Sequence, residues 1–418
     1  AVAAGAEDVE PTDKKEWSPA QRSVVGLLMP KPGAGAAATV AAVKPVRGLA
    51  MVVADATLTT TAASATRIEA MRCLCWLVSS CPRAEWGRTM VDVLVPGLLM
   101  LLLSAPPSSS SPATAATTAA PSPTETRYVE MAQVAELLAL LVTSTEFAPT
   151  VRPALTTRVG ALPVLLQQPH PRLVLHVLRV MEGACLQCKP NAVELGTANA
   201  AAAAFAVLAS AGETSPLGSA ALKALVNLTN ECAEGVRGLL GADASIAPAL
   251  LARLRDRLER VWAARNDHSQ SRDEADADFD ACLLLLCVVA NVAEDDAVGL
   301  PALARVTAFA NNGADPCAFL VSAFLQSLPV AASSLLTSGD THSTIEFGWT
   351  PEELVLSAHV SLVVGCLVRD ASAKERLTRA LPGQRGFSPF IQVLDAFLEF
   401  QREAGVLTRE NAEAVARV

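Results

Sequence analysis

One stretch of this chain, residues 217–234, limits the possible fold more than any other. It predicts a helix of small and apolar residues that ends in polar Asn, Thr and Glu side chains. A helix that is apolar nearly all round cannot lie alone on a surface and must be covered on most sides. The fold therefore has to supply neighbouring helices that pack around this one.

Similar sequences recur along the chain, at residues 172–189, 281–296 and 354–370, with a weaker copy at 67–81. Aligning them places Asn227 on Gly183, a shift of 44 (227 − 183), and on Asn291, a shift of 64 (291 − 227). Units of about 40 residues are typical of armadillo and HEAT repeats. We interpret the longer shift as one unit plus a charged insertion. The predicted fold is an all-α, elongated and irregular array of HEAT/armadillo-type repeats.

The composition is consistent with packed helices and disfavours two kinds of partner, nucleic acids and membranes. Hydrophobic residues make up 51% of the chain and aromatic residues 4%, which suits close helix–helix contact more than strands. The net charge of −9, without a basic tract, disfavours direct binding of nucleic acid. The apolar run at 91–103 is too short to cross a bilayer and contains Pro96, so no membrane span is expected.

Changes in composition divide the chain. We expect a flexible N-terminal segment at 1–20, N-terminal helical repeats at 21–104, a disordered insertion rich in Pro, Ser and Thr at 105–126, and the main repeat region at 127–418. Ser-Pro and Thr content in the insertion would suit phosphorylation, although a plain loop has the same composition. Within the main region we expect one alanine-rich helix at 192–211 and a charged loop at 265–280. The first residue is Ala and no signal pattern follows, which indicates a fragment of a longer intracellular protein.

The cysteines and histidines do not form a catalytic or metal-binding pattern. Cys185 and Cys188 form a CxxC, but no second CxxC or nearby pair of histidines completes a zinc site. Most of the ten cysteines lie in apolar helical sequence, which predicts buried free thiols in a reducing compartment. His176 and His359 lie on apolar helices, where a core position is the usual outcome. Since no hydrolase, phosphate-loop or dinucleotide motif occurs either, we expect no enzyme activity, catalytic residue, metal or cofactor.

Three acids, Glu294, Asp295 and Asp296, end the helix that begins near Ala281. Acidic residues at a helix C-terminus oppose its dipole. They fit either a contact with a basic partner or a solvated turn.

Asparagines are the other candidate contacts. Asn227 and Asn230 lie three residues apart on one helical face, beside Glu231, and Asn291 takes the matching place in another repeat. In armadillo arrays, asparagines at this position hydrogen-bond the backbone of a bound peptide. Capping of carbonyls in the neighbouring turn is the equal alternative.

Three segments together resemble the C-terminal domain of the Wapl family of cohesin-release factors. They are VLRVMEGACLQCKPN at 177–191, ALKALVNLTNECAEG at 221–235, and the block at 359–408, which has a GCL sequence, a charged helix ending in Leu-Pro, a Gly-rich turn with Phe-Ser, and VL-x-x-F-x-x-F. The last block is the most specific of the three. The resemblance covers roughly residues 170–410.

The resemblance implies a non-enzymatic helical-repeat domain in the nucleus, associated with chromatin. Its partners would be cohesin subunits and their HEAT-repeat accessory proteins, and its effect would be release of the cohesin ring. Family members often carry Phe-Gly-Phe motifs in an N-terminal extension, and none occurs in this sequence. The alternative function is a general armadillo or HEAT adaptor that binds an extended peptide of another protein. The sequence leaves the oligomeric state open.

Overall fold

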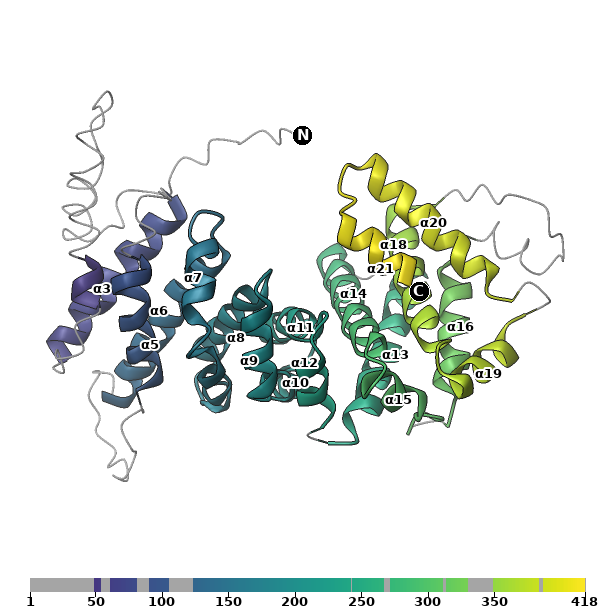
Figure 1. Ribbon diagram of the computed structural model, residues 1–418, viewed down its shortest axis with the longest axis horizontal. Coiled ribbons are helices and arrows are strands. Elements are labelled where there is room, and N and C mark those ends of the chain that lie inside the picture. Colours follow the sequence, from purple (N-terminus) through teal and green to yellow (C-terminus); the bar gives the residue numbers. More distant parts are fainter. Residues whose placement is uncertain are drawn as a thin grey trace. The chain divides into compact units, whose positions relative to one another are not determined.

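The computed structural model describes residues 49–53, 61–80, 90–104, 123–241, 243–266, 271–310, 313–329, 349–382 and 386–417 (Figure 1). Within these ranges every regular element is a helix. The all-α prediction is therefore confirmed. The expected flexible segment at 1–20 lies outside the described residues, as does 105–122 of the expected insertion.

The chain divides into two compact units, residues 1–158 and 159–418. The sequence predicts a boundary between helical regions at the insertion, 105–126. The division comes later because the helix that follows the insertion packs on helices that precede it. That helix begins inside the expected insertion, at Pro123.

The first unit is built around one long helix, α6, which packs on α3 and α5. Its described elements are α3 (Thr61–Ser80), η3 (Met90–Leu94), α5 (Val95–Leu103), α6 (Pro123–Thr143) and α7 (Ala148–Leu155). A buried ion pair joins α3 to α6, with 2.7 Å between Arg67 Nε and Glu130 Oε1. Arg127 also pairs with Glu130, at 2.8 Å. The pairing explains how a charged side chain can lie in this apolar core.

The second unit repeats a pattern of a short helix, a second helix and a third helix. An opening pair, η4 (Val159–Gln167) and α8 (Pro171–Cys185), precedes α9 (Lys189–Thr197), α10 (Ala200–Ala211) and α11 (Pro216–Thr229). The next triplet is α12 (Ala233–Leu240), α13 (Ile246–Asn266) and α14 (Arg272–Glu294). It is followed by α15 (Gly299–Ala304), α16 (Pro316–Ser327) and α18 (Pro351–Leu367). The last triplet is α19 (Ala371–Ala380), α20 (Ser388–Glu403) and α21 (Arg409–Arg417). This arrangement is an armadillo-type helical repeat.

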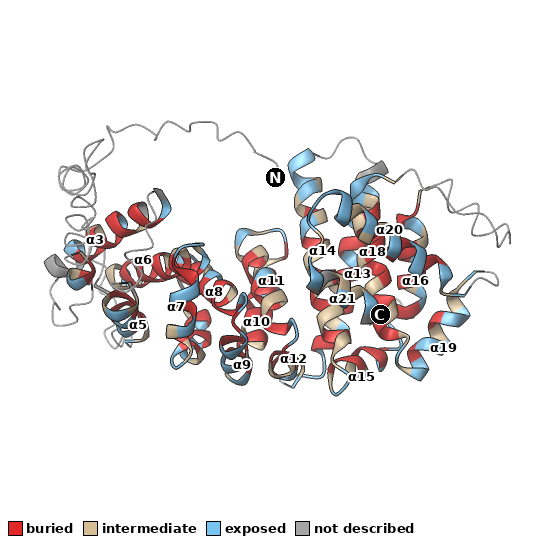
Figure 2. Ribbon diagram, turned by 45° about the horizontal axis from the view of Figure 1, so that its top comes forward, coloured by how far each residue is buried: buried red, intermediate tan, exposed pale blue. Residues whose placement is uncertain are grey.

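The third helices of successive repeats are neighbours, in the order α8, α11, α14 and α18. Their apolar sides form the core, which runs through the unit as buried segments of each ribbon (Figure 2). Most of the apolar segment at 217–234 lies in α11. This helix contacts α8, α10 and α14, as a helix with apolar residues on most sides requires. Ser215 caps its N-terminus by accepting a bond from Gly218 N at 3.0 Å.

Two glycines permit the tight turn between one repeat and the next. A Cβ on Gly235 would lie 1.8 Å from Leu228 O, and a Cβ on Gly299 would lie 1.8 Å from Val292 O. The two positions are 64 residues apart (299 − 235), the same shift that relates Asn227 to Asn291. The repeat therefore extends from the third helix into the first helix of the following triplet.

Two local predictions are wrong. The predicted single helix at 192–211 is two helices, α9 and α10, because Asn199 adopts a left-handed conformation with φ 58° and breaks the run. Of the predicted charged loop at 265–280, the part from Arg272 onward is helical. Ser271 caps this helix, early acids suit its N-terminal dipole, and Asp278 is paired with the buried Arg257.

The long shift of 64 residues has the expected size but a different source. In the triplet that contains it, α13 has 21 residues and α14 has 23, against 12 in α10 and 14 in α11. Most of the extra length is therefore helix and not loop. No single described helix is long and apolar enough to span a membrane, and one bent pair, α9 with α10, meets that test jointly.

Candidate functional site

The two aligned asparagines make the same contact in successive repeats. Asn227 Nδ2 lies 3.4 Å from the carbonyl oxygen of Glu182 on α8, and Asn291 Nδ2 lies 3.0 Å from the carbonyl oxygen of Val226 on α11. In each case the acceptor is one residue before the aligned position in the preceding third helix. The side chains therefore join neighbouring repeats at one register.

Helix chemistry explains the contact. The last carbonyl groups of a helix have few partners within it, and an amide from the next repeat can supply one or add a second. Val226 O accepts from Asn230 N at 3.0 Å as well as from Asn291. Of the two interpretations left open by the sequence, capping thus accounts for the amide nitrogens. Asn291 Nδ2 also donates to Thr229 Oγ1 at 3.2 Å, so both of its N–H groups have partners. Its carbonyl oxygen remains the group that can accept a bond from a ligand.

The turn after α11 places two polar side chains in solvent. Asn230 and Glu231 are exposed, and Glu231 has φ 48°. Gln187, which lies 44 residues earlier (231 − 187), has φ 55° in the turn after α8. A non-glycine residue in this conformation is uncommon, so its recurrence indicates a shared turn geometry.

The three acids at the end of α14 have different structural roles. Asp295 Oδ1 accepts from Val298 N at 2.7 Å and from Gly299 N at 3.1 Å, and so caps the start of α15. Asp296 pairs with Arg369, whose guanidinium also donates to Glu294 O at 3.1 Å. The acids are therefore not a simple solvated turn, because Asp295 connects α14 to α15 and Asp296 connects it to Arg369, which follows α18.

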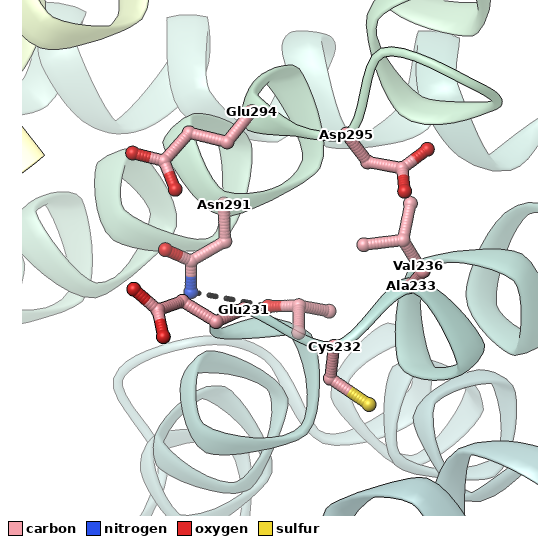
Figure 3. A pocket seen from close by; sticks show the side chains of 8 residues that line it. Glu231, Cys232, Ala233, Val236, Asn291, Glu294 and Asp295 are labelled. Atoms are coloured by element: carbon pink, nitrogen blue, oxygen red, sulfur yellow. Dashed lines mark hydrogen bonds between the residues drawn. The ribbon is translucent and has the colours of Figure 1, made fainter. Parts of the chain in front are cut away.

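Four of the predicted site residues meet around one cavity of about 270 Å³. The cavity lies between the turn from α11 to α12 and the C-terminal end of α14, and its lining residues are Thr229, Glu231, Cys232, Ala233, Val236, Asn291, Glu294 and Asp295. In Figure 3 the carboxylates of Glu231 and Glu294 extend to the same side as the Asn291 oxygen, while the Asp295 side chain lies on the opposite side. Asn227, Asn230 and Asp296 do not line this cavity.

The electrostatics of the cavity favour a cationic or hydrogen-bond-donating group. Three carboxylates line it, and α11 and α14 both end beside it, which adds the negative ends of two helix dipoles, while the first turn of α12 adds one positive end. Ionised carboxylates only accept hydrogen bonds, and so does the remaining oxygen of Asn291. Burial raises the pKa of the Cys232 thiol, and Glu234 raises it further against opposing backbone hydrogen bonds, so this thiol stays protonated at neutral pH.

Sequence reasoning missed two cations on the same helices. Arg179 on α8 and Lys223 on α11 are exposed and lie 44 residues apart (223 − 179), at one repeat position. Both interact electrostatically with Glu182, whose pKa is raised by burial and lowered by these two charges, with a net rise. The repeat shift alone could have identified them. Arg369 was also missed, since only the fold brings α18 beside the end of α14.

The described histidines and cysteines, which are the candidate catalytic or metal-binding residues, take part in helix capping or lie in the helix packing. His170 caps α8 by accepting from Leu173 N at 3.2 Å. His359 Nδ1 lies 2.7 Å from Val355 O, and burial lowers the pKa of this ring. All nine described cysteines are free thiols. Among the described residues, no group of three or more His, Cys, Asp or Glu side chains could hold a metal ion.

No protein-family model matches the chain, and no curated protein sequence matches it. Among solved structures, it is similar to a designed armadillo repeat protein, at 13% identity and a TM-score of 0.45, over 77% of this chain and 99% of that one. A second designed armadillo repeat protein, in complex with peptide (KR)4, has 13% identity, a TM-score of 0.44 and the same two coverages. The structure of SYS-1 has 10% identity and a TM-score of 0.46, over 95% of this chain and 68% of that one. The repeat assignment rests on the helix triplets described above and not on these scores.

Proposed function

We propose that this chain is a protein-interaction module that binds an extended segment of a partner protein. The binding site would be the exposed side of α8, α11 and α14, which we call the third-helix face and define by Arg179, Glu182, Lys223, Asn227, Cys287 and Asn291. Polar side chains at matching repeat positions, leading to an acceptor-lined cavity, are the observation that carries this proposal.

A repeat array suits such a role because each unit presents an equivalent surface at a regular interval. An extended peptide lying across the third helices would meet one set of side chains per repeat. The Asn291 oxygen and the carboxylates around the cavity would accept bonds from its N–H or ammonium groups. Since Asn227 and Asn291 already use N–H groups to join repeats, the donors that the face offers are Arg179 and Lys223, and its acceptors lie around the cavity.

The experiment is a selection from a random peptide display library with the full chain as bait, followed by affinity measurements on the selected peptides. We expect Lys223→Glu to change those affinities by at least about fivefold, since charge contacts at an interface of this kind contribute about 1 kcal/mol or more. Lys374→Glu, at an exposed lysine on α19, is the matched control and should change nothing. Equal affinities for both variants and the unaltered chain would refute the proposed site.

A finer proposal is a Wapl-type function in the nucleus, on chromatin-bound cohesin. It is supported by the resemblance of three segments, which lie in α8–α9, α11–α12 and α18–α20 of one unit. The chain would bind cohesin subunits or their HEAT-repeat accessory proteins and favour the open state of the ring. A binding protein shifts such an equilibrium only by its difference in affinity for the two states.

Purified cohesin, with and without its accessory proteins, tests this finer proposal. Saturable binding that accelerates release of cohesin from DNA is the expected result. Selected peptides that bind the third-helix face, together with no measurable binding of cohesin or its accessory proteins, would favour the general adaptor instead.

A further inference from the structure

Aligned positions on the third-helix face change charge from one repeat to the next. The rows that define this change, each written in the order α8, α11, α14, are Arg179, Lys223, Cys287; Arg172, Pro216, Asp280; Leu186, Asn230, Glu294; and Gln187, Glu231, Asp295. Each of these four rows loses positive charge or gains negative charge toward α14, whereas the row of Glu182, Val226 and Ala290 loses one negative charge. The face is therefore basic at Arg179 on α8 and Lys223 on α11, and acidic in the turn after α11 and at the end of α14.

The basic end has charge available for a ligand. Arg179 and Lys223 are exposed, and neither forms an ion pair with any residue that the structure describes. Both interact electrostatically with Glu182, which is half-buried and whose pKa is raised by that burial. Two unpaired cations beside one desolvated carboxyl give this end a net positive potential.

The acidic end is shaped as well as charged. Glu231, Glu294 and Asp295 line the cavity of about 270 Å³ at the ends of α11 and α14. The Asn291 amide, whose N–H groups bond to α11, adds its oxygen. The polar part of the cavity therefore favours water or a group that donates hydrogen bonds, such as a lysine ammonium or an arginine guanidinium.

We propose that the third-helix face binds one bipolar segment of a partner protein, with acidic residues over α8 and α11 and a basic side chain in the cavity beside α14. This inference rests on the proposed function and specifies the chemistry of the partner. Charge complementarity of this kind sets the register and direction of a bound segment more than its affinity.

The geometry gives the spacing between the two charged blocks. Lys223 precedes Glu231 by eight residues (231 − 223), which is roughly 12 Å along a helix axis. The acidic end lies about one helix spacing, roughly 8–10 Å, to the side. The two ends are therefore about 15 Å apart, the length of about four residues of extended chain.

Two synthetic peptides test the inference by fluorescence anisotropy with the full chain. The block peptide has three Asp, four Gly or Ser residues and three Lys, and the alternating peptide has the same composition with Asp and Lys interleaved. We expect the block peptide to bind at least about tenfold more tightly at low salt, with the difference shrinking as salt screens the charges. Equal affinities would overturn the bipolar inference.

Matched variants locate the binding. Lys223→Glu and Glu231→Lys should each weaken the block peptide about fivefold, while Lys374→Glu and Glu403→Lys, which change net charge equally at exposed positions on α19 and α20, should not. Circular dichroism melts confirm that each variant is folded. If both control variants weaken binding as much as the test variants, the inference is wrong.

The failure of this inference is distinguishable from that of the proposed function. Display-selected peptides that respond to Lys223→Glu, together with equal affinities for block and alternating peptides, leave a binding module without charge polarity. Selected peptides that do not respond to Lys223→Glu refute the binding site itself.

Discussion

At the scale of single residues, the polar ends of the third helices combine two roles. Asn291 joins α14 to α11 through its nitrogen and presents its oxygen to the cavity. Asp295 caps the next helix and lines the same cavity. Removing such a side chain changes both the packing and the cavity, so a loss of binding alone would not show which role matters. The predictions for single residues therefore concern stability.

Replacing Asn291 with Ala removes the bonds to Val226 O and Thr229 Oγ1. Val226 O keeps its bond from Asn230 N, so the variant loses two side-chain hydrogen bonds at about 0.5–1.5 kcal/mol each, and we expect the free energy of unfolding to fall by about 1–3 kcal/mol. Asn230→Ala is the control, because this exposed residue makes no side-chain bond to any described residue, and its effect should stay within about 0.5 kcal/mol. Urea denaturation of both variants measures the difference, and equal stabilities would contradict the capping role.

Gly235 is expected to reject any side chain. A Cβ there would meet Leu228 O at 1.8 Å, so Gly235→Ala forces backbone to move and should destabilise the protein by about 1–3 kcal/mol. Gly160→Ala serves as comparison, because its nearest contact would be an ordinary 3.5 Å. A midpoint of thermal unfolding that falls equally in both variants would show that the turn can adapt.

At the scale of elements, one buried ion network holds the longest helices of the second unit. Arg257 on α13 pairs with Glu213, at 2.7 Å, and with Asp278 on α14, while Arg253 also pairs with Glu213. Breaking a buried pair leaves an uncompensated charge and costs several kcal/mol. This network is why a hydrophilic sequence that predicts a loop becomes the first turns of α14.

The same network predicts a dependence of stability on pH. Burial alone would raise the pKa of the Glu213 carboxyl, but hydrogen bonds from Arg257 and Arg253 outweigh it and hold the pKa below its usual 4.5. The folded state therefore gains stability above pH 4.5 and loses that gain as pH falls through the lower folded pKa. Urea denaturation from pH 6 to pH 3 should show this loss, and Glu213→Gln should reduce its slope. An unchanged slope in the variant would place the acid sensitivity elsewhere.

The sequence predicts the interiors of these helices better than their ends. The apolar pattern and the Asn227 and Asn291 alignment were sufficient to identify the third helices and their register. The break at Asn199 and the helical start at Arg272 were not predictable, because the first depends on one residue's backbone conformation and the second on a pairing with Arg257 from another helix. The sequence identifies the acids that line the cavity as candidate site residues. It does not predict the cavity itself, because the contact between α11 and α14 depends on helix packing.

At the scale of the whole molecule, the chain consists of two compact units, and the third-helix face lies entirely in the second. Residues 159–418 should therefore fold alone and retain binding. The expected result is a helical fragment with a cooperative melt and the same affinity for display-selected peptides as the full chain. An unfolded fragment would show that the first unit is needed for folding, and a folded fragment without affinity would place the binding residues in residues 1–158.

Hydrogen–deuterium exchange of the full chain, with and without a saturating selected peptide, tests most directly whether the third-helix face is the binding site. We predict slower exchange in α8, in the turn from α11 to α12 and at the C-terminal end of α14, with no change in α19. Protection confined to α13, α16 or α19, with none at the ends of α11 and α14, would contradict it.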